Sequence, residues 1–284
     1  MREYQAGPYA PDPGRVKSPL RYPGGKFYAL KYIMPYIQCV EHDEYREPFF
    51  GGGAVYFAKK KAAVNILNDL GSDIMNVYQV IQDEREREQL IGMLEQETAT
   101  KERHGQIKEF VPETVLEEAY KTYYLNRTSY CGIINTPAWG YAKGKSSPPE
   151  NWGNFIRKAS AKLQGARLFS LDYRQILSMP AEGKRVLMYL DPPYFHADQK
   201  RAYKESFEPE DHLRLAEDLR QTPYLFCLSY DDCDEIREMY DWAYQYDVSW
   251  LYNTDNRSGG CRKAGKELII TNYKVLRRQT EGEP

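Results

Sequence analysis

The stretch Val186–Tyr194, which reads VLMYLDPPY, decides the fold of this 284-residue chain. Its first five residues are an apolar run of strand length, and Asp191-Pro192-Pro193-Tyr194 follows without a gap. In open α/β sheets, ligands bind at the carboxyl ends of the strands. Two successive prolines fix φ and remove two backbone donors, which leaves carbonyl oxygens free to face a pocket. The stretch therefore predicts a buried strand that ends in a binding site.

The tetrapeptide has the residue types that methylation of an aromatic amine requires. Such a nitrogen is a poor nucleophile because its lone pair is delocalised, and two acceptors that each take one amine hydrogen favour a tetrahedral nitrogen. In this interpretation the Asp191 carboxylate and the Pro192 carbonyl are those acceptors, and they stabilise the positive charge that grows on nitrogen. Tyr194 offers a flat face for a base flipped from a duplex, and Phe195 extends that wall. The alternative is a plain strand-terminating turn, since Asp-Pro and Pro-Pro are turn dipeptides.

Strand and helix patterns alternate around this stretch, which predicts a largely parallel sheet covered by helices on both faces. The other expected strands are short and mostly apolar, and they cover 45–49, 64–67, 224–228, 246–251 and 268–273. The expected helices cover 26–37, 54–61, 209–220 and 234–240, together with one that Ser72 caps. The alternation therefore predicts an α/β class protein.

The alternation stops between residues 83 and 165, which indicates an inserted second subdomain. This segment contains a charged helix, a helix over 113–126 that Pro112 opens, and an irregular stretch over 130–152. The domain organisation that we expect is an extended N-terminal arm over 1–18, a catalytic domain over 19–82 and 166–284, and the inserted subdomain over 83–165.

The bulk properties are those of an ordinary soluble protein. Hydrophobic residues make up 42% and charged residues 28% of the chain, and no apolar run approaches the roughly 20 residues that span a membrane. The N-terminus has no apolar signal region, so we expect a cytoplasmic protein. Five scattered cysteines without a C-x-x-C pair, and only four histidines, argue against a disulfide framework and against a zinc site. No metal is expected.

Charge is unevenly distributed along the chain, although the net charge is only −2. Residues 121–170 hold eight basic residues against one acid, and 15–31 holds five basic residues and no acid, whereas 205–241 is strongly acidic. This segregation suits a protein with one phosphate-facing surface. Solvated helix faces explain the charges equally well, so charge alone leaves a nucleic-acid partner open.

A glycine turn earlier in the chain predicts a nucleoside site. Glu47–Gly53 reads EPFFGGG and follows a strand, and Asp69 closes the next strand. Glycines let a ligand approach the backbone, and a carboxylate accepts both ribose hydroxyls. The turn is not G-x-G-x-x-G, which favours S-adenosylmethionine over a dinucleotide. Gly24-Gly25-Lys26 lacks the earlier glycine and the Ser/Thr of a P-loop.

Together these motifs resemble the Dam-type DNA adenine methyltransferases, in which the cofactor motif precedes target recognition and the catalytic motif comes last. The resemblance runs from about Pro19 to Leu276. The matching segments are LRYPGGK (20–26), EPFFGGG (47–53), ND (68–69), YLNR (124–127) with Tyr130 and Gly132, LDY (171–173), DPPY (191–194) and SGGCRK (258–263). It implies a Rossmann-like, S-adenosylmethionine-dependent methyltransferase sheet with an inserted, mainly helical target-recognition subdomain that carries a β-hairpin.

The resemblance also implies roles for individual residues. The catalytic residues would be Asp191, Pro192, Pro193 and Tyr194. The S-adenosylmethionine pocket would be lined by Tyr22, Lys26, Glu47, Phe49, Phe50, Gly51, Gly53, Asp69, Asp172, Tyr173 and Asp191. The residues expected to contact double-stranded DNA are Arg21, Asn126, Arg127, Tyr130, Lys143, Lys145, Arg262 and Lys263. Arginine at position 21 would contact guanine bidentately. Alternatively, Arg127 and Tyr130 only brace the hairpin, and Arg262 and Lys263 are solvated.

The chain departs from the family pattern in two places. Ile134 stands where members that read GATC have an arginine, so GATC specificity is not expected, and Ser258 replaces the family asparagine. Three alternatives to a site-specific adenine methyltransferase remain: a methyltransferase for RNA adenine or a glutamine amide, a catalytically silent DNA-binding module, and a nucleotide-dependent oxidoreductase. The intact tetrapeptide and the missing dinucleotide motif disfavour the last two. A prokaryotic or phage source is expected, and a cognate restriction endonuclease as partner is left open.

Overall fold

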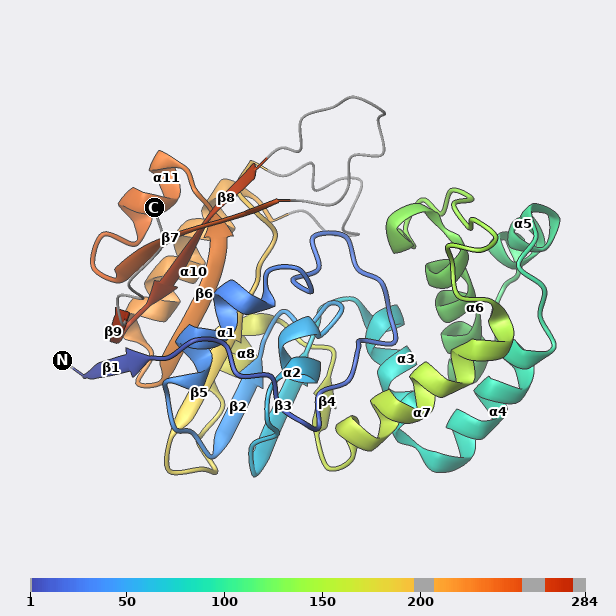
Figure 1. Ribbon diagram of the computed structural model, residues 1–284, viewed down its shortest axis with the longest axis horizontal. Helices are drawn as coiled ribbons and strands as arrows, with labels where there is room; N and C mark the ends of the chain where they lie inside the picture. The colour runs from blue at the N-terminus through green and yellow to red at the C-terminus, as the bar shows by residue number, and fades with distance from the viewer. Residues whose placement is uncertain (1, 197–206, 252–263, 278–284) are drawn as a thin grey trace.

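The computed structural model describes residues 2–196, 207–251 and 264–277, and its centre is a seven-stranded sheet (Figure 1). The order across the sheet is β4-β3-β2-β5-β6-β8-β7. Its strands are β2 (Glu44–Glu47), β3 (Val64–Asn68), β4 (Arg167–Phe169), β5 (Val186–Leu190), β6 (Leu225–Asp231), β7 (Tyr244–Leu251) and β8 (Ala264–Thr271). The strands from β4 to β6 are parallel, and β8 runs antiparallel to β6 and β7. The predicted α/β fold with a mostly parallel sheet is confirmed.

Strand β5 lies in the middle of this sheet because every one of its residues is apolar. It pairs with β2 on one side and β6 on the other, and all five residues are buried. Leu187 and Tyr189 belong to one hydrophobic core, and Met188 and Leu190 belong to the core on the opposite face. Strands covered on both faces read as continuous apolar runs, and this is why VLMYL shows no alternation with polar residues.

Helices cover both faces of the sheet. They are α1 (Leu30–Gln38), α2 (Ala54–Ala58), α3 (Ser72–Gln82), α8 (Tyr173–Ser178), α10 (Pro209–Gln221) and α11 (Asp234–Met239). Residues of α1, α2 and α3 belong to the larger core, whereas α8, α10 and α11 pack around the second core. Each core therefore covers one face of β5, and only the ends of the strand remain accessible to a ligand.

A helical segment lies between α3 and β4 and forms the right-hand part of Figure 1. It contains α4 (Glu84–Glu95), α5 (Lys101–Glu109), α6 (Val115–Thr128), η1 (Tyr130–Gly132), η2 (Pro149–Asn151) and α7 (Trp152–Leu163). Helices α6 and α7 pack on α3, and the buried Trp152 ring lies 5.9 Å from the rings of Tyr123 and Tyr124. Residues 83–165 are thus an insertion in the strand-helix order, and their identity as a target-recognition subdomain stays a prediction.

The β-hairpin expected in this insertion does not form among the described residues. Between η1 and η2 there is no strand, and the one antiparallel contact is an isolated bridge between Ser129 and Trp139. Cys131 and Gly132 have φ of 53° and 75°, which turns the chain out of an extended path. Pro137 cannot donate to a ladder. The segment is therefore an irregular loop.

Three helix starts also differ from the sequence expectation. The helix expected from residue 26 begins at Leu30, because Ala29 closes a turn on Lys26 first. Gly71 occupies the N-cap of α3, and Ser72 is its first residue without a capping bond. Helix α6 begins at Val115 under a capping box made by Thr114 and Glu117, two residues later than Pro112 suggested.

The N-terminal segment 1–18 is held to the body of the protein rather than projecting from it. Strand β1 (Glu3–Ala6) pairs in parallel with β9 (Lys274–Arg277). Further along, the Val16 N–H donates to the Phe57 carbonyl at 2.9 Å. None of the described helices combines the length and apolar character that a membrane crossing would need.

Candidate active site

A cavity of about 360 Å³ opens where β2, β3, β4 and β5 end, at the carboxyl edge of the sheet. Its wall takes residues 47–55 after β2, 69–74 after β3, 171–173 after β4, and Asp191 with Pro193 after β5. Three further segments contribute to it: residues from 22 to 26, residues 132–135 of the inserted segment, and Phe207, Asp211 and Arg214 at and before the start of α10. Parallel strands bring their carboxyl ends together, so motifs far apart in sequence meet in one cavity.

The glycine turn after β2 is shaped by the rings packed against it. Gly51 and Gly53 have φ of 45° and 62°. A Cβ on Gly51 would lie 2.9 Å from the Tyr22 ring, and one on Gly53 would lie 2.5 Å from the Phe50 ring. The Tyr78 hydroxyl donates to the Gly51 carbonyl at 2.9 Å. The turn therefore needs glycine for its backbone conformation and for close contact, and it leaves main chain facing the cavity.

Asp69 holds this turn from the neighbouring strand. Its Oδ2 accepts from the Gly51 N–H at 2.7 Å, and its Oδ1 accepts from the Gly71 N–H at 2.9 Å. Burial raises the pKa of Asp69, while these two N–H groups favour its charged form. Each carboxylate oxygen has a second lone pair, so Asp69 can also accept two hydroxyl groups from a ligand in the cavity.

Glu47 is a second carboxyl group in the cavity wall, and it is 2% exposed. Its Oε1 accepts from the Tyr45 hydroxyl at 2.7 Å and from the Tyr56 N–H at 3.2 Å. Its Oε2 is buried without a hydrogen-bond partner among the described residues. Burial raises the pKa of Glu47 to about 8. A buried polar atom left unpaired is costly, so Oε2 marks a place where a polar ligand atom would fit.

Asp191 lines the cavity after β5, the strand next to β2, and is fixed by two donors. Its Oδ1 lies 2.7 Å from Lys26 Nζ and accepts from the Ser229 hydroxyl at 3.0 Å. Lys26 also donates to the Gly24 carbonyl at 3.0 Å, and its ammonium lies 4.6 Å from the centre of the Tyr194 ring. Because both donors use Oδ1, the geometry keeps Oδ2 available as an acceptor.

The remaining residues of the tetrapeptide surround Asp191. Pro193 lines the cavity, Pro192 is buried, and Tyr194 adjoins the cavity through its contact with Lys26. The Tyr194 hydroxyl donates to Glu267 Oε2 at 2.5 Å. Burial, followed by the charge of Glu267, raises the pKa of Tyr194, so this phenol stays protonated and its ring is held in one orientation.

An aromatic cluster lines one part of the cavity. The Phe49 and Tyr173 rings stack at 5.2 Å with 28° between their planes, and Phe207 meets Phe49 edge-on at 5.9 Å. Asp172 is exposed next to Tyr173 and caps α8, where its Oδ1 accepts from the Arg174 N–H at 2.9 Å. All of the residues predicted to bind the cofactor line this one cavity: Tyr22, Lys26, Glu47, Phe49, Phe50, Gly51, Gly53, Asp69, Asp172, Tyr173 and Asp191.

Two predicted DNA contacts instead face the interior of the protein. The Arg21 guanidinium donates to the carbonyls of Asn126, at 3.1 Å, and Arg127. Asn126 is fully buried, and its Nδ2 donates to the Arg21 carbonyl at 2.6 Å and to the Gly132 carbonyl at 2.9 Å. Burial, followed by the charge of Arg127, lowers the pKa of Arg21 to about 10. The pair therefore braces the 22–26 segment against η1, and Asn126 has no surface to offer DNA.

The other predicted DNA contacts differ in exposure. Tyr130, Lys143 and Lys145 are exposed, whereas the half-buried Arg127 lies over the Phe155 ring at 5.2 Å. Arg262 and Lys263 lie outside the described residues. The first three are thus the members of the predicted set that the structure places where a duplex can reach them.

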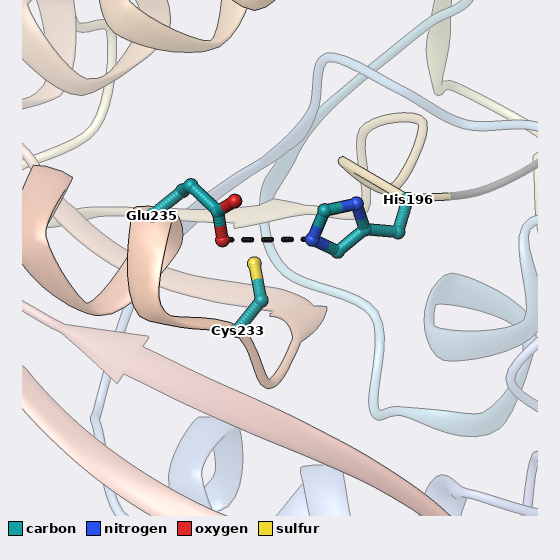
Figure 2. Close-up of side chains that lie close together, drawn as sticks. All are labelled: His196, Cys233 and Glu235. Carbon is teal, nitrogen blue, oxygen red and sulfur yellow. Dashed lines mark ion pairs between the residues drawn. The ribbon is translucent and has the colours of Figure 1, made fainter.

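The chain beyond Tyr194 is tied to the start of α11. The Asp231 carboxylate accepts from the N–H groups of Phe195 and His196, both at 3.0 Å. His196 Nε2 then lies 3.5 Å from Glu235 Oε2, with the Cys233 thiol beside them (Figure 2). None of the three drawn side chains lines the cavity. The contact between His196 and Glu235 holds the chain after Tyr194 against α11.

The predicted site residues left out four residues that build the site: Asn68, which stood in the matching ND segment without a role, Phe207, Ser229 and Glu267. Asn68 Nδ2 donates to the Pro48 and Leu171 carbonyls, both at 2.9 Å, and its Oδ1 accepts from the Leu171 N–H at 2.9 Å. This one amide ties together the chain after β2, β3 and β4. Its signal was available, because a buried asparagine at a strand end must satisfy its amide locally.

Comparison with known proteins agrees with this geometry. A family model described as D12 class N6 adenine-specific DNA methyltransferase matches residues 22–254. The type II methyltransferase M1.LlaDCHI of Lactococcus lactis subsp. cremoris is 27% identical, over 89% of this chain and 94% of its own length. The type II methyltransferase M.CviBI of Paramecium bursaria Chlorella virus NC1A is 23% identical, over 91% and 100%. The DNA N-6-adenine-methyltransferase of Escherichia phage P1 is 28% identical, over 63% of this chain and 24% of its own length.

The matched span contains the glycine turn, Asp69, the aromatic cluster and the whole of Asp191–Tyr194, which form or adjoin the cavity. By this match, this chain belongs to the D12 class N6 adenine-specific DNA methyltransferases.

Proposed function

We propose that the chain transfers a methyl group from S-adenosylmethionine to the N6 amine of an adenine flipped out of duplex DNA, at one specific sequence. The observation that carries this proposal is that Asp191, an acceptor for an amine, lines the same cavity as Asp69 and the glycine turn, which suit a nucleoside. Methyltransferases of this family generally use S-adenosylmethionine. We place the activity in the cytoplasm of a prokaryote or of a phage-infected cell.

The cavity residues fit that cofactor group by group. Asp69 would accept the ribose hydroxyls, and the cluster of Phe49, Tyr173 and Phe207 would offer an aromatic wall to a flat purine ring. The unpaired Oε2 of Glu47 and the ammonium of Lys26 would meet the polar methionine end. When bound, the cofactor supplies a methyl group on a positively charged sulfur.

Asp191 and Pro192 act on the adenine amine. In the proposed mechanism, Asp191 Oδ2 and the Pro192 carbonyl each accept one N6 hydrogen, so the nitrogen lone pair turns toward the methyl group. The hydrogen bond from the Ser229 hydroxyl holds the Asp191 carboxylate in one orientation. The negative charge of Asp191 would stabilise the positive charge that develops on nitrogen as the sulfur–methyl bond breaks, and one N6 proton would then leave through this carboxylate to solvent. Preorganisation of this kind is usually the largest contribution to catalysis.

The Tyr194 ring would stack on the flipped base, and Glu267 holds that ring by its hydroxyl. Base flipping requires such a pocket because the amine is out of reach inside a duplex. Lys26 now lies over the same ring, so its ammonium has to move aside when a base enters. After this movement the Lys26 ammonium would bind the polar methionine end of the cofactor.

Labelling with methyl-tritiated S-adenosylmethionine tests the proposal. Wild-type protein should label unmethylated phage DNA and leave RNA of the same sequence unlabelled. Asp191→Ala should abolish labelling, by at least about 100-fold, and bind S-adenosylhomocysteine within about threefold of wild type. Asp241→Ala, at a carboxylate whose side chain is 75% exposed, is the matched control and should label normally. Normal labelling by Asp191→Ala would refute the mechanism.

Relatives named as type II and modification methylases suggest a role in restriction-modification. We therefore infer that the protein marks one short sequence and that a cognate endonuclease cuts the same sequence when it is unmarked. Long-read sequencing of DNA from a host that expresses the gene should show N6-methyladenine in a single motif. Methylation spread over all adenines would contradict site specificity.

A further inference from the structure

Three aromatic side chains are exposed in the part of the chain that the structure describes: Phe27, Tyr28 and Tyr130, at 49%, 58% and 47%. The chain has 25 tyrosines, 10 phenylalanines and 4 tryptophans, and every other ring whose exposure the structure describes is buried or half-buried. Exposed rings are therefore rare in this protein. All three stand beside the cavity, because Phe27 follows Lys26 directly and Tyr130 lies two residues before Gly132.

Phe27 and Tyr28 have no place in either hydrophobic core. Their rings meet edge-on at 5.4 Å, so each limits the freedom of the other. The preceding residue, Lys26, reaches Asp191 at 2.7 Å, which fixes the backbone of this segment at the mouth of the cavity. The exposure of the Phe27 and Tyr28 rings beside the cavity does not stabilise the fold. Their exposed faces are suited to contact with another flat group.

Basic residues flank this pair of rings in the sequence, and one of them, Lys17, lies close to the Phe27 ring. Arg15, Lys17 and Lys31 are exposed, and none of them pairs with a carboxylate among the described residues. Lys17 Nζ lies 5.6 Å from the centre of the Phe27 ring. The stretch 15–31 contains no acid. Many other arginines of the protein are paired, for example Arg157 with Glu88 at 2.8 Å. Unpaired cations beside exposed rings are typical of surfaces that bind unstacked nucleic acid.

We propose that Phe27 and Tyr28, together with Arg15, Lys17 and Lys31, form a DNA-binding rim that contacts the bases and phosphates next to the flipped adenine. The inference rests on the proposed function and names a contact surface for that same site. The two rings fill or flank the gap that the extruded base leaves, as apolar side chains do when they enter a base step. The three cations neutralise phosphates on that side of the gap. Tyr130 stands on the other segment of the mouth.

Steady-state methylation of unmethylated phage DNA tests the rim, with S-adenosylhomocysteine affinity measured in parallel. The double variant Phe27→Ala/Tyr28→Ala should raise the KM for DNA about 10-fold or more and keep the cofactor affinity within about twofold. Phe27→Leu/Tyr28→Leu keeps the apolar surface but removes the ring faces, and it should be as defective as the alanine variant. Val111→Ala, at a residue that is 77% exposed in the inserted segment, is the control for surface change.

The charged part of the rim is tested by the salt dependence of DNA binding. Arg15→Gln/Lys17→Gln/Lys31→Gln should lower the slope of log K against log salt by about 3, since each lost phosphate contact removes about 0.9. Lys60→Gln, at an exposed lysine before β3 and hence at the other edge of the sheet, should leave the slope unchanged.

The outcomes separate the two proposals. A wild-type protein that neither binds nor labels DNA overturns the proposed function and the rim together. A wild type that labels DNA, with a double alanine variant whose KM matches that of Val111→Ala, overturns the rim and leaves the proposed function intact. Recovery of the wild-type KM by the leucine variant overturns the stacking role of the rings.

Discussion

Replacing Asp69 by alanine removes the group that we expect to bind the ribose. The carboxylate already accepts two backbone N–H groups, at 2.7 and 2.9 Å, and its second lone pairs would take two ribose hydroxyls. A hydrogen bond to a charged group contributes about 1.5–3 kcal/mol. Loss of two such bonds costs at least about 3 kcal/mol, which corresponds to roughly 100-fold in Kd.

Isothermal titration calorimetry with S-adenosylhomocysteine measures this loss without requiring catalysis. The titration is run well below the unfolding temperature, because Asp69→Ala also frees the Gly51 and Gly71 N–H groups and destabilises the turn. The matched control is Asp83→Ala. Asp83 likewise accepts from a backbone N–H, that of Glu86 at 2.8 Å, but it does not line the cavity. An Asp69→Ala affinity within about threefold of wild type would show that Asp69 does not bind the ribose.

Two further predictions concern stability. The pKa of Glu47 rises from 4.5 to about 8 through burial, so the folded protein keeps a proton that the unfolded chain releases. The free energy of unfolding should therefore fall between about pH 5 and 8, by up to about 1.4 kcal/mol per pH unit. Urea unfolding midpoints measured across this range should show a flatter pH profile for Glu47→Gln than for wild type. An unchanged slope in the variant would exclude Glu47 as the source of the pH dependence. Asn68→Ala should lower the free energy of unfolding by about 3 kcal/mol or more, since the three hydrogen bonds of the buried Asn68 amide are lost. A urea unfolding midpoint equal to that of wild type would show that these hydrogen bonds do not stabilise the fold.

The sheet was largely predictable from sequence, because its strands are buried on both faces. The apolar runs around Leu187, Ile66 and Phe226 occur in strands that have neighbours on two sides. The cavity was predictable for the same reason, since residues directly after parallel strands meet at one edge. The cofactor set from Tyr22 to Asp191 follows from that rule and from the family motifs.

Side-chain partners across long sequence distances were beyond sequence reasoning. Ser229 is 38 residues from Asp191, and Glu267 is 73 residues from Tyr194. No local pattern marks which serine or glutamate will lie opposite a given strand end. Arg21 illustrates the same limit, because an arginine in a basic stretch suggests a surface contact. Its hydrogen bonds to Asn126 instead hold it against the interior, and no local pattern predicts them. The missing hairpin reflects backbone preferences at Cys131 and Gly132 that composition does not reveal.

The pairing of β1 with β9 brings residues 3–6 beside residues 274–277. Ribosomes make the chain from its N-terminus, so β1 has no partner until β9 has been made. Closure of this small sheet consequently follows synthesis of the seven-stranded sheet, and it joins Lys274 to Glu3 by an ion pair at 2.8 Å. A circular permutant that joins β9 to β1 by a linker and opens the chain near the exposed Val111 would make the two strands consecutive, and their docking would no longer wait for the rest of the protein.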